Sequence, residues 1–279
     1  MIRIGRMNRL KVVKTVDFGI FLDGDTLGNI LLPKRYVPQG AAVGNELDVF
    51  IYLDSNDDVI ATTLTPKVMV GECAFLTVKE INKVGAFLDW GLPKDLLVPY
   101  NEQQKPMEAD RSYVVHVFLD PHTGRITASS RLSRHLHESA YGLQVNQEVE
   151  LLISGRSDLG FKTVVNDEFI GLIFFEDSPR TLLVGEKITG YVKQIRPDGK
   201  INLTVRQPAN RGDAKTTLAN RILDDLKQHG GRSTLTDKSD PDLIFERFGV
   251  SKGNYKNALS QLYKERKILI SKEEITLVE

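Results

Sequence analysis

The stretch "LTVKEINKVGAFLDWG" (residues 76–91) places an apolar run before Gly85 and an aromatic residue shortly after it. A similar stretch, "VKTVDFGIFLDG", occupies residues 13–24, with Gly19 at the matching position. When Gly160 is set in register with these two glycines, three segments of the chain agree without gaps. Internal repetition has to be tested first, because a missed repeat leads to the wrong fold. The sequence therefore predicts one structural unit that is used three times.

Apolar residues recur at fixed distances from the three glycines. Upstream of the glycine the copies carry Val12, Val78 or Ile153, and far downstream all three carry isoleucine, at positions 60, 126 and 201. The other matched sets are Leu31, Leu97 and Leu172; Leu32, Val98 and Ile173; Leu47, Tyr113 and Ile188; and Ile51, Val117 and Val192. Agreement at so many positions without an insertion indicates triplication rather than chance.

Each unit has the pattern of short β-strands. Stretches such as "LDVFIYLD" and "YVVHVFLD" alternate or run apolar, and "PHTG" and "RPDG" are typical turns. A unit of about 60–65 residues with five short strands has the size of a small closed barrel of the OB type. We therefore expect a mainly β, multidomain chain with five-stranded OB-type barrels at residues 1–66, 67–132 and 145–208, and a linker at 133–144.

These residues resemble the RNA-binding repeat named after ribosomal protein S1. The resemblance rests on "VDFGIFL" followed by a leucine-rich strand, on "VGNELDVFI", and on a final turn into "VIATTL". The second copy matches the pattern more fully, and the third matches mainly in its second half. Together the copies cover residues 1–208.

The resemblance also implies which residues contact nucleic acid. In that family two aromatic residues bracketing the glycine stack on bases; the copies here carry Phe18 and Phe21, Val84 and Phe87, and Leu159 and Lys162. The third copy therefore lacks the stacking platform. The acidic and basic positions around the last turn fall on Asp54 in copy one, Asp120 and Arg125 in copy two, and Lys200 in copy three. Copy two, with Phe87, Asp120 and Arg125, is the best candidate.

Physical chemistry supports this assignment. An exposed phenylalanine can stack on any base, for about 1–3 kcal/mol per base, and cations that follow a tight turn can reach phosphate oxygens. The basic pair Lys34 and Arg35 adds charge to copy one. The alternative is that the phenylalanines merely fill the barrels. Trp90 is expected to pack either on a neighbouring part of the chain or on a base.

After residue 208 the strand pattern stops, and residues 209–279 show helical spacing. "TTLANRILDDLKQHG", "DPDLIFERFG" and "SKGNYKNALSQLYKERK" predict three helices, the last with Ser251 as its N-cap, and "ILISKEEITLVE" predicts two strands. This order resembles an α+β winged helix domain. Its third helix, with Lys252 and Lys256, is the candidate for contacting a groove of the nucleic acid, and Lys272 marks the wing. The segment is only mildly basic, so docking of a protein is the alternative.

Three S1-like units followed by a winged helix form an arrangement similar to the conserved virulence factor B family of RNA-binding proteins. The resemblance spans the whole chain and rests on domain order. It implies single-stranded RNA as the ligand and a role in post-transcriptional regulation. A DNA-binding transcription regulator led by the winged helix, and a protein-interaction scaffold, are the alternatives.

Composition limits the other classes of function. Lys plus Arg and Asp plus Glu both total 37 in 279 residues, so a polyanion must be met by local basic patches. The single cysteine, Cys73, excludes an internal disulfide, and the chain lacks the motifs of common enzymes. His135 and His137 have no metal-ligand partners at suitable spacing. We expect a soluble cytoplasmic protein that is not an enzyme, has no metal or cofactor and does not bind a membrane; the oligomeric state is left open.

Overall fold

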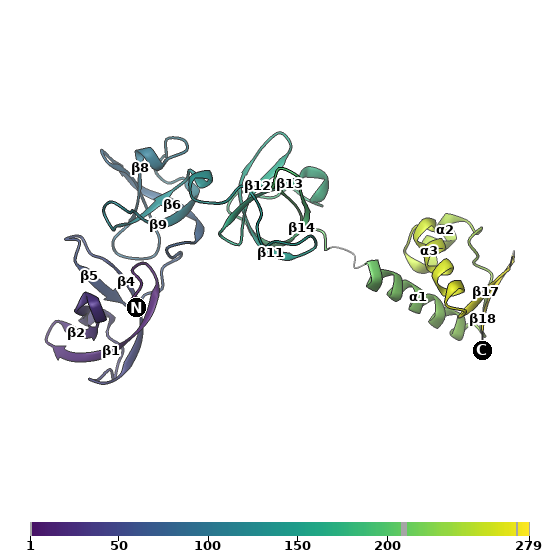
Figure 1. Ribbon diagram of the computed structural model, residues 1–279, viewed down its shortest axis with the longest axis horizontal. Coiled ribbons are helices and arrows are strands. Elements are labelled where there is room, and N and C mark those ends of the chain that lie inside the picture. The colour runs from purple at the N-terminus through teal and green to yellow at the C-terminus, as the bar shows by residue number, and fades with distance from the viewer. Residues whose placement is uncertain (1, 208–210, 272, 279) are drawn as a thin grey trace. The chain divides into compact units, whose positions relative to one another are not determined.

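The computed structural model describes residues 2–207, 211–271 and 273–278. The chain divides into two compact units, Met1–Gln207 and Pro208–Glu279. The first unit contains three closed five-stranded barrels in tandem, and the second contains three helices and a small sheet (Figure 1). This architecture confirms the predicted fold class.

The three barrels have the same topology. The first barrel contains β1 (Met7–Val16), β2 (Gly19–Asp23), β3 (Asn29–Pro33), β4 (Glu46–Leu53) and β5 (Val59–Thr62). The second contains β6 (Cys73–Asn82), β7 (Gly85–Leu88), β8 (Leu96–Pro99), β9 (Ser112–Leu119) and β10 (Ile126–Ser129). The third contains β11 (Glu148–Arg156), β12 (Gly160–Val165), β13 (Phe169–Phe174), β14 (Lys187–Ile195) and β15 (Ile201–Thr204). In each barrel the third strand pairs in parallel with the fifth, and all the other pairs are antiparallel. The repeat seen in the sequence is therefore a repeat of the whole barrel.

The matched glycines lie where a side chain does not fit. A Cβ atom at Gly19, Gly85 or Gly160 would lie only 2.3, 2.3 or 2.0 Å from the carbonyl oxygen of the facing strand. A backbone oxygen held in a ladder cannot move aside as a flexible side chain can. Close approach between the second and third strands of each barrel thus explains why glycine recurs at this position.

The matched valine or isoleucine upstream marks a β-bulge. Val12, Val78 and Ile153 are fully buried, and the pairing of the first strand with the second shifts register directly after each of them. A bulge bends a strand and increases its twist. The first strand of each barrel pairs with the fourth strand along its first half and with the second strand along its other half. The bend therefore lets one long strand belong to both sides of the barrel.

The first and second barrels share an apolar contact. Phe50 and Tyr52 of β4 are buried and pack in one cluster with Trp90 and other core residues of the second barrel. The Phe50 and Trp90 rings meet edge to face with centroids 5.7 Å apart, and Trp90 Nε1 donates to Lys94 O at 2.6 Å. Of the two alternatives for Trp90, packing on a neighbouring part of the chain is the one found.

The second and third barrels are joined through a docked connector. Leu136 is buried in a cluster with Cys73, Val114, Leu152 and Val164. His137 forms an isolated parallel bridge with Phe169, and a short 3₁₀ helix, η4 (Leu132–Arg134), precedes it. The beginning of the predicted linker at 133–144 is thus packed against both barrels rather than free.

The C-terminal unit contains the elements expected of a winged helix. They are α1 (Arg211–Gln228), β16 (Arg232–Ser233), α2 (Pro241–Phe248), α3 (Lys252–Lys264), β17 (Ile268–Ile270) and β18 (Ile275–Leu277), with sheet order β16-β18-β17. Ser251 is the N-cap of α3, as predicted, and its side chain accepts a hydrogen bond from Asn254 N. The two-residue strand β16 was not predicted, because two residues show no alternation. None of the described helices combines the length and apolarity needed to cross a membrane.

Candidate nucleic-acid interface

Strand register aligns a row of residues across each barrel, on the face of the strands that points away from that barrel's own core. In the first barrel the row is Lys14, Phe21, Leu31, Ile60 and Tyr52. In the second it is Glu80, Phe87, Leu97, Thr127 and Phe118, and in the third it is Gly155, Lys162, Leu172, Asn202 and Gln194. On β2, β7 and β12 the residues on either side of the row, such as Ile20 and Leu22, are buried in the barrel core, because side chains alternate along a strand. We call these three sets the outer rows.

The first barrel presents two aromatic rings beside two cations. Phe18 is 60% exposed, and its ring meets that of the half-buried Phe21 edge to face, with centroids 6.2 Å apart. Lys34 and Arg35 are exposed on η2 (Lys34–Tyr36), and Lys34 N donates to Phe18 O at 2.9 Å. Neither phenylalanine belongs to the barrel core. These four predicted residues therefore come together on one side of the first barrel.

The second barrel offers a smaller aromatic surface. Phe87 is half-buried in its outer row, and Val84, at the other bracketing position, is 48% exposed. Without a second ring, Phe87 has no aromatic partner comparable to the Phe18–Phe21 pair.

The two predicted acidic residues shape the turns that carry them. Asp54 Oδ1 accepts hydrogen bonds from Asn56 N at 2.8 Å and Asp58 N at 3.1 Å. Asp120 Oδ1 accepts from His122 N at 2.8 Å, and backbone hydrogen bonds of this kind hold the pKa of Asp120 below its usual value. These are the side chain-to-backbone bonds of Asx turns. The position of Asp54 and Asp120 is accounted for by the turn alone.

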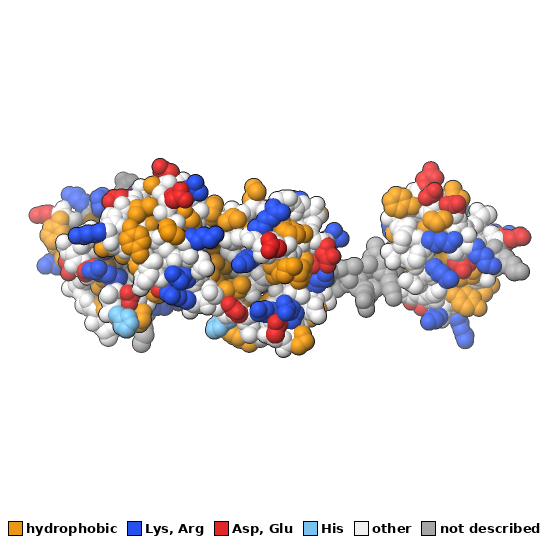
Figure 2. All heavy atoms as spheres, turned by 90° about the horizontal axis from the view of Figure 1, so that it is seen from above, with side chains coloured by type: hydrophobic (Ala, Val, Ile, Leu, Met, Phe, Trp, Pro, Cys, Tyr) orange, Lys and Arg blue, Asp and Glu red, His pale blue; other side chains and the backbone are white. Residues whose placement is uncertain are grey.

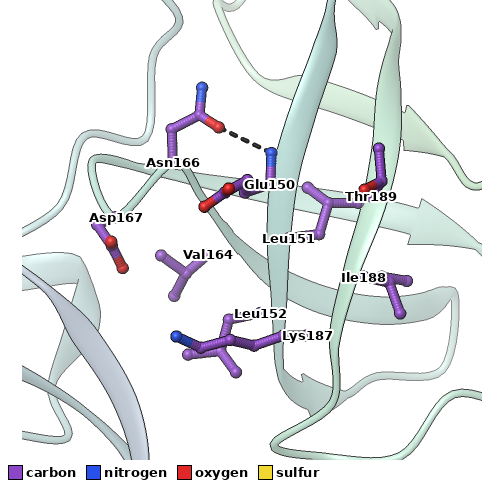
Figure 3. Close-up of a pocket in the computed structure, with 9 residues that line it drawn as sticks. All are labelled: Glu150, Leu151, Leu152, Val164, Asn166, Asp167, Lys187, Ile188 and Thr189. Carbon is purple, nitrogen blue, oxygen red and sulfur yellow. Dashed lines mark hydrogen bonds between the residues drawn. The ribbon is translucent and has the colours of Figure 1, made fainter. Parts of the chain in front are cut away.

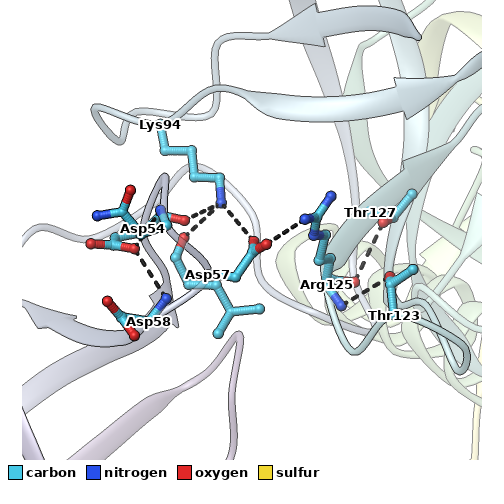
Figure 4. Close-up of polar contacts among 9 residues, drawn as sticks. Asp54, Asp57, Asp58, Lys94, Thr123, Arg125 and Thr127 are labelled. Atoms are coloured by element: carbon cyan, nitrogen blue, oxygen red, sulfur yellow. Dashed lines mark hydrogen bonds and ion pairs between the residues drawn. The ribbon is translucent and has the colours of Figure 1, made fainter.

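Arg125 lies at the junction of the first two barrels (Figure 4). Its guanidinium donates to Asp57 of the first barrel, and this hydrogen bond is the main cause that lowers the pKa of Asp57. Lys94 Nζ lies 3.8 Å from the same carboxylate and donates to the carbonyl oxygens of Leu53 and Asp54. The predicted phosphate-binding arginine is thus already engaged by a carboxylate. Neither Asp57 nor Lys94 was singled out from the sequence, because no local pattern relates residues so far apart.

Two hollows on the third barrel differ in character. Lys162 and Lys200 line a groove of about 670 Å³ together with Leu159, which is 62% exposed. A second pocket, of about 420 Å³, includes Glu150, Asp167 and Lys187 (Figure 3). From the sequence, Lys200 was predicted to contact nucleic acid. Lys162 was noted only because it occupies a position where the S1 repeat has an aromatic residue.

In the C-terminal unit, Lys256 is exposed on α3, whereas Lys252 is half-buried and its Nζ lies 3.3 Å from Lys238 O. Lys272 lies outside the described residues.

On the face shown in Figure 2, Lys and Arg side chains are interspersed with Asp and Glu, in keeping with a net charge of zero.

The histidines near the connector are accounted for by packing. His116 and His135 stack with ring centroids 5.5 Å apart, and His135 Nε2 lies 3.2 Å from a Glu102 oxygen. Burial, with a smaller contribution from His135, lowers the pKa of His116 to about 4. Within the described part of the chain, no group of three or more His, Cys, Asp or Glu side chains is arranged to hold a metal ion.

Comparison with known proteins agrees with this domain order. A family model of the S1 domain matches residues 4–64, and a model of the CvfB-like winged helix domain matches residues 220–277. A protein of Bacillus subtilis strain 168 named "Uncharacterized protein YitL" is 30% identical over 284 residues, covering 95% of this chain and 91% of that protein. The chain belongs to the conserved virulence factor B family.

Other members of the family are similar along most of their length. "Conserved virulence factor B" of Staphylococcus saprophyticus is 25% identical, covering 85% of this chain and 81% of its own. The protein of the same name from Staphylococcus aureus strain N315 is 26% identical, covering 98% and 94%. A crystal structure of a multidomain protein with nucleic acid binding domains from Streptococcus pneumoniae TIGR4 aligns over 99% of this chain and 98% of its own, at 23% identity and a TM-score of 0.42.

The S1 domain and the winged helix are domain types that bind nucleic acids. This member of the conserved virulence factor B family is, at that level of description, a nucleic-acid-binding protein.

Proposed function

We propose that the chain binds single-stranded RNA, with bases stacked on Phe18 and Phe21 of the first barrel, and that it acts in post-transcriptional regulation by binding rather than catalysis. The observation that carries this proposal is the exposed Phe18 ring against Phe21, beside Lys34 and Arg35. A large apolar side chain that is 60% exposed and flanked by cations suits a ligand that offers both flat bases and phosphates.

Single strands fit this surface better than duplexes. In a duplex the bases are stacked on each other, so a ring outside the helix cannot stack on them, whereas unpaired bases are free to splay onto aromatic side chains. Stacking does not distinguish RNA from DNA. The preference for RNA follows from the resemblance to the S1 repeat, and the 2′-hydroxyl is the group through which it would be exerted.

The test is fluorescence anisotropy of the full-length protein with matched labelled oligonucleotides: single-stranded RNA, single-stranded DNA and duplex DNA, at two salt concentrations. Binding that is tightest for single-stranded RNA and weakens with salt supports the proposal. Preferential binding to the duplex would move the function to the winged helix, where Lys256 is exposed on α3. No binding to any of the three would favour a protein-interaction scaffold instead.

A further inference from the structure

The third barrel carries a groove across the face that corresponds to the stacking surface of the first. Its floor is formed by Lys162 of β12, Leu172 of β13 and Asn202 of β15, which are successive register partners in the outer row. Polar side chains of the second barrel and the connector, including Ser130 and Ser133, line the groove as well. The groove has a volume of about 670 Å³.

Charge in this groove is strongly one-sided. Its lining includes four cationic side chains and a single carboxylate, Glu138; the cations are Arg156, Lys162, Arg196 and Lys200. Arg196 is paired with Asp198 at 2.9 Å, and the Arg156 guanidinium lies 4.9 Å from the centre of the Phe175 ring. Lys162 and Lys200 are exposed and have no carboxylate partner within the described residues. Two ammonium groups are therefore free to meet an anion.

The equivalent positions in the other barrels show what has changed. Lys162 stands where the first two barrels have Phe21 and Phe87. Beside it, Gly155 replaces Lys14 and Glu80, and a Cβ atom at Gly155 would have no neighbour within 4 Å. The aromatic platform has thus become an open cationic floor. The other pocket of this barrel, which holds Glu150 and Asp167 beside Lys187, lacks this bias (Figure 3).

We propose that the groove of the third barrel binds the phosphodiester backbone of single-stranded RNA through Lys162 and Lys200, without stacking on bases. This inference rests on the proposed function and deepens it. The first barrel holds bases by stacking, whereas the third holds the strand by charge. The Ser133 hydroxyl in the lining supplies a hydrogen bond to a phosphate or ribose oxygen. Binding at this groove is therefore indifferent to base identity.

The test measures how the affinity for labelled oligo(U) depends on salt. Each phosphate contact to a single strand adds about 0.7 to the slope of log K against log salt concentration. Lys162→Gln and Lys200→Gln should each lower the magnitude of the slope by about 0.7, and the double variant by about 1.4. Lys162→Arg should keep the wild-type slope, because the charge is retained. The loss in affinity should be the same for oligo(A) as for oligo(U).

Lys187→Gln is the matched control, because it removes the same charge from an exposed position elsewhere on this barrel. Its slope should equal that of the wild type. If the wild type binds oligo(U) and the double variant keeps the full slope, the inference about the groove is overturned while the proposed function stands. If the wild type binds no single-stranded RNA, both are overturned. Thermal melting of each variant checks that the exposed substitutions leave the fold intact.

Discussion

Arg125 of the second barrel and Asp57 of the first form an ion pair across 68 residues of sequence. The arginine that the S1 resemblance assigns to phosphate binding thus also links two barrels. Both side chains remain partly exposed, 54% and 41%, so a phosphate can approach the guanidinium and compete with the carboxylate. RNA binding and the junction between the barrels are therefore expected to be coupled.

Removing the competing carboxylate should strengthen RNA binding. Asp57→Asn leaves Arg125 without its acidic partner, and we expect the Kd for single-stranded RNA to fall by roughly threefold at low salt. Because the pair is exposed, the free energy of unfolding should change little. Anisotropy and urea denaturation measure the two effects. Asp58→Asn, which removes the same charge from the same turn, is the control; weaker binding by the Asp57 variant would show that the junction itself is needed.

The phenylalanines of the first barrel should contribute to the affinity for single-stranded RNA. Phe18→Ala and Phe21→Ala are each expected to weaken binding of single-stranded RNA by about 1–3 kcal/mol, the range of one stacked base. Val43→Ala serves as the control, because Val43 is 62% exposed on the same barrel but belongs neither to the outer row nor to the Phe18–Phe21 ring pair. Unchanged affinity in both phenylalanine variants, measured by anisotropy, would refute stacking on the first barrel.

The register glycine of the third barrel should tolerate no side chain. Gly160→Ala places a Cβ atom 2.0 Å from Ile173 O, and separating β12 from β13 should cost more than about 2 kcal/mol. Gly155→Ala, in the same barrel, meets nothing within 4 Å and should change stability by less than about 1 kcal/mol. Hydrogen exchange of β12 amides reports on this barrel specifically. Equal protection in the two variants would contradict the steric explanation.

Acid should destabilise the junction of the second and third barrels through His116. Burial lowers the pKa of His116 to about 4 from an ordinary value near 6.5, so the unfolded chain binds a proton more readily than the folded one. The stabilisation is complete above about pH 6.5 and is lost as the pH falls towards 4, by up to about 3 kcal/mol. His116→Gln should flatten this dependence in urea denaturation at pH 7 and pH 4.5. The exposed His122→Gln should leave it unchanged.

Features contained within one domain could be predicted from sequence. Gly19, Gly85 and Gly160 recur because each faces a carbonyl oxygen of its own barrel, and Ser251 was recognised as a cap because capping depends only on adjacent residues. The strands could be predicted for the same reason, because the alternation of core and surface residues is also a local pattern.

Features that depend on how barrels meet could not be predicted. Phe50 against Trp90, and Arg125 against Asp57, join residues that no periodicity relates. The groove around Lys162 was missed for a further reason. A lysine at a stacking position appears in the sequence only as an absent aromatic ring, and its free ammonium group becomes apparent once the neighbouring strands and the connector are placed around it.

The connector between the second and third barrels limits where recombination can divide the gene without disturbing the fold. Leu136 supplies a core side chain at the junction, and His137 is paired to the backbone beside Phe169. A recombination event that cut the gene within this segment would separate the third barrel from part of its own packing. Exchange of whole domains between related genes should therefore transmit the second barrel, the connector and the third barrel as a single heritable block.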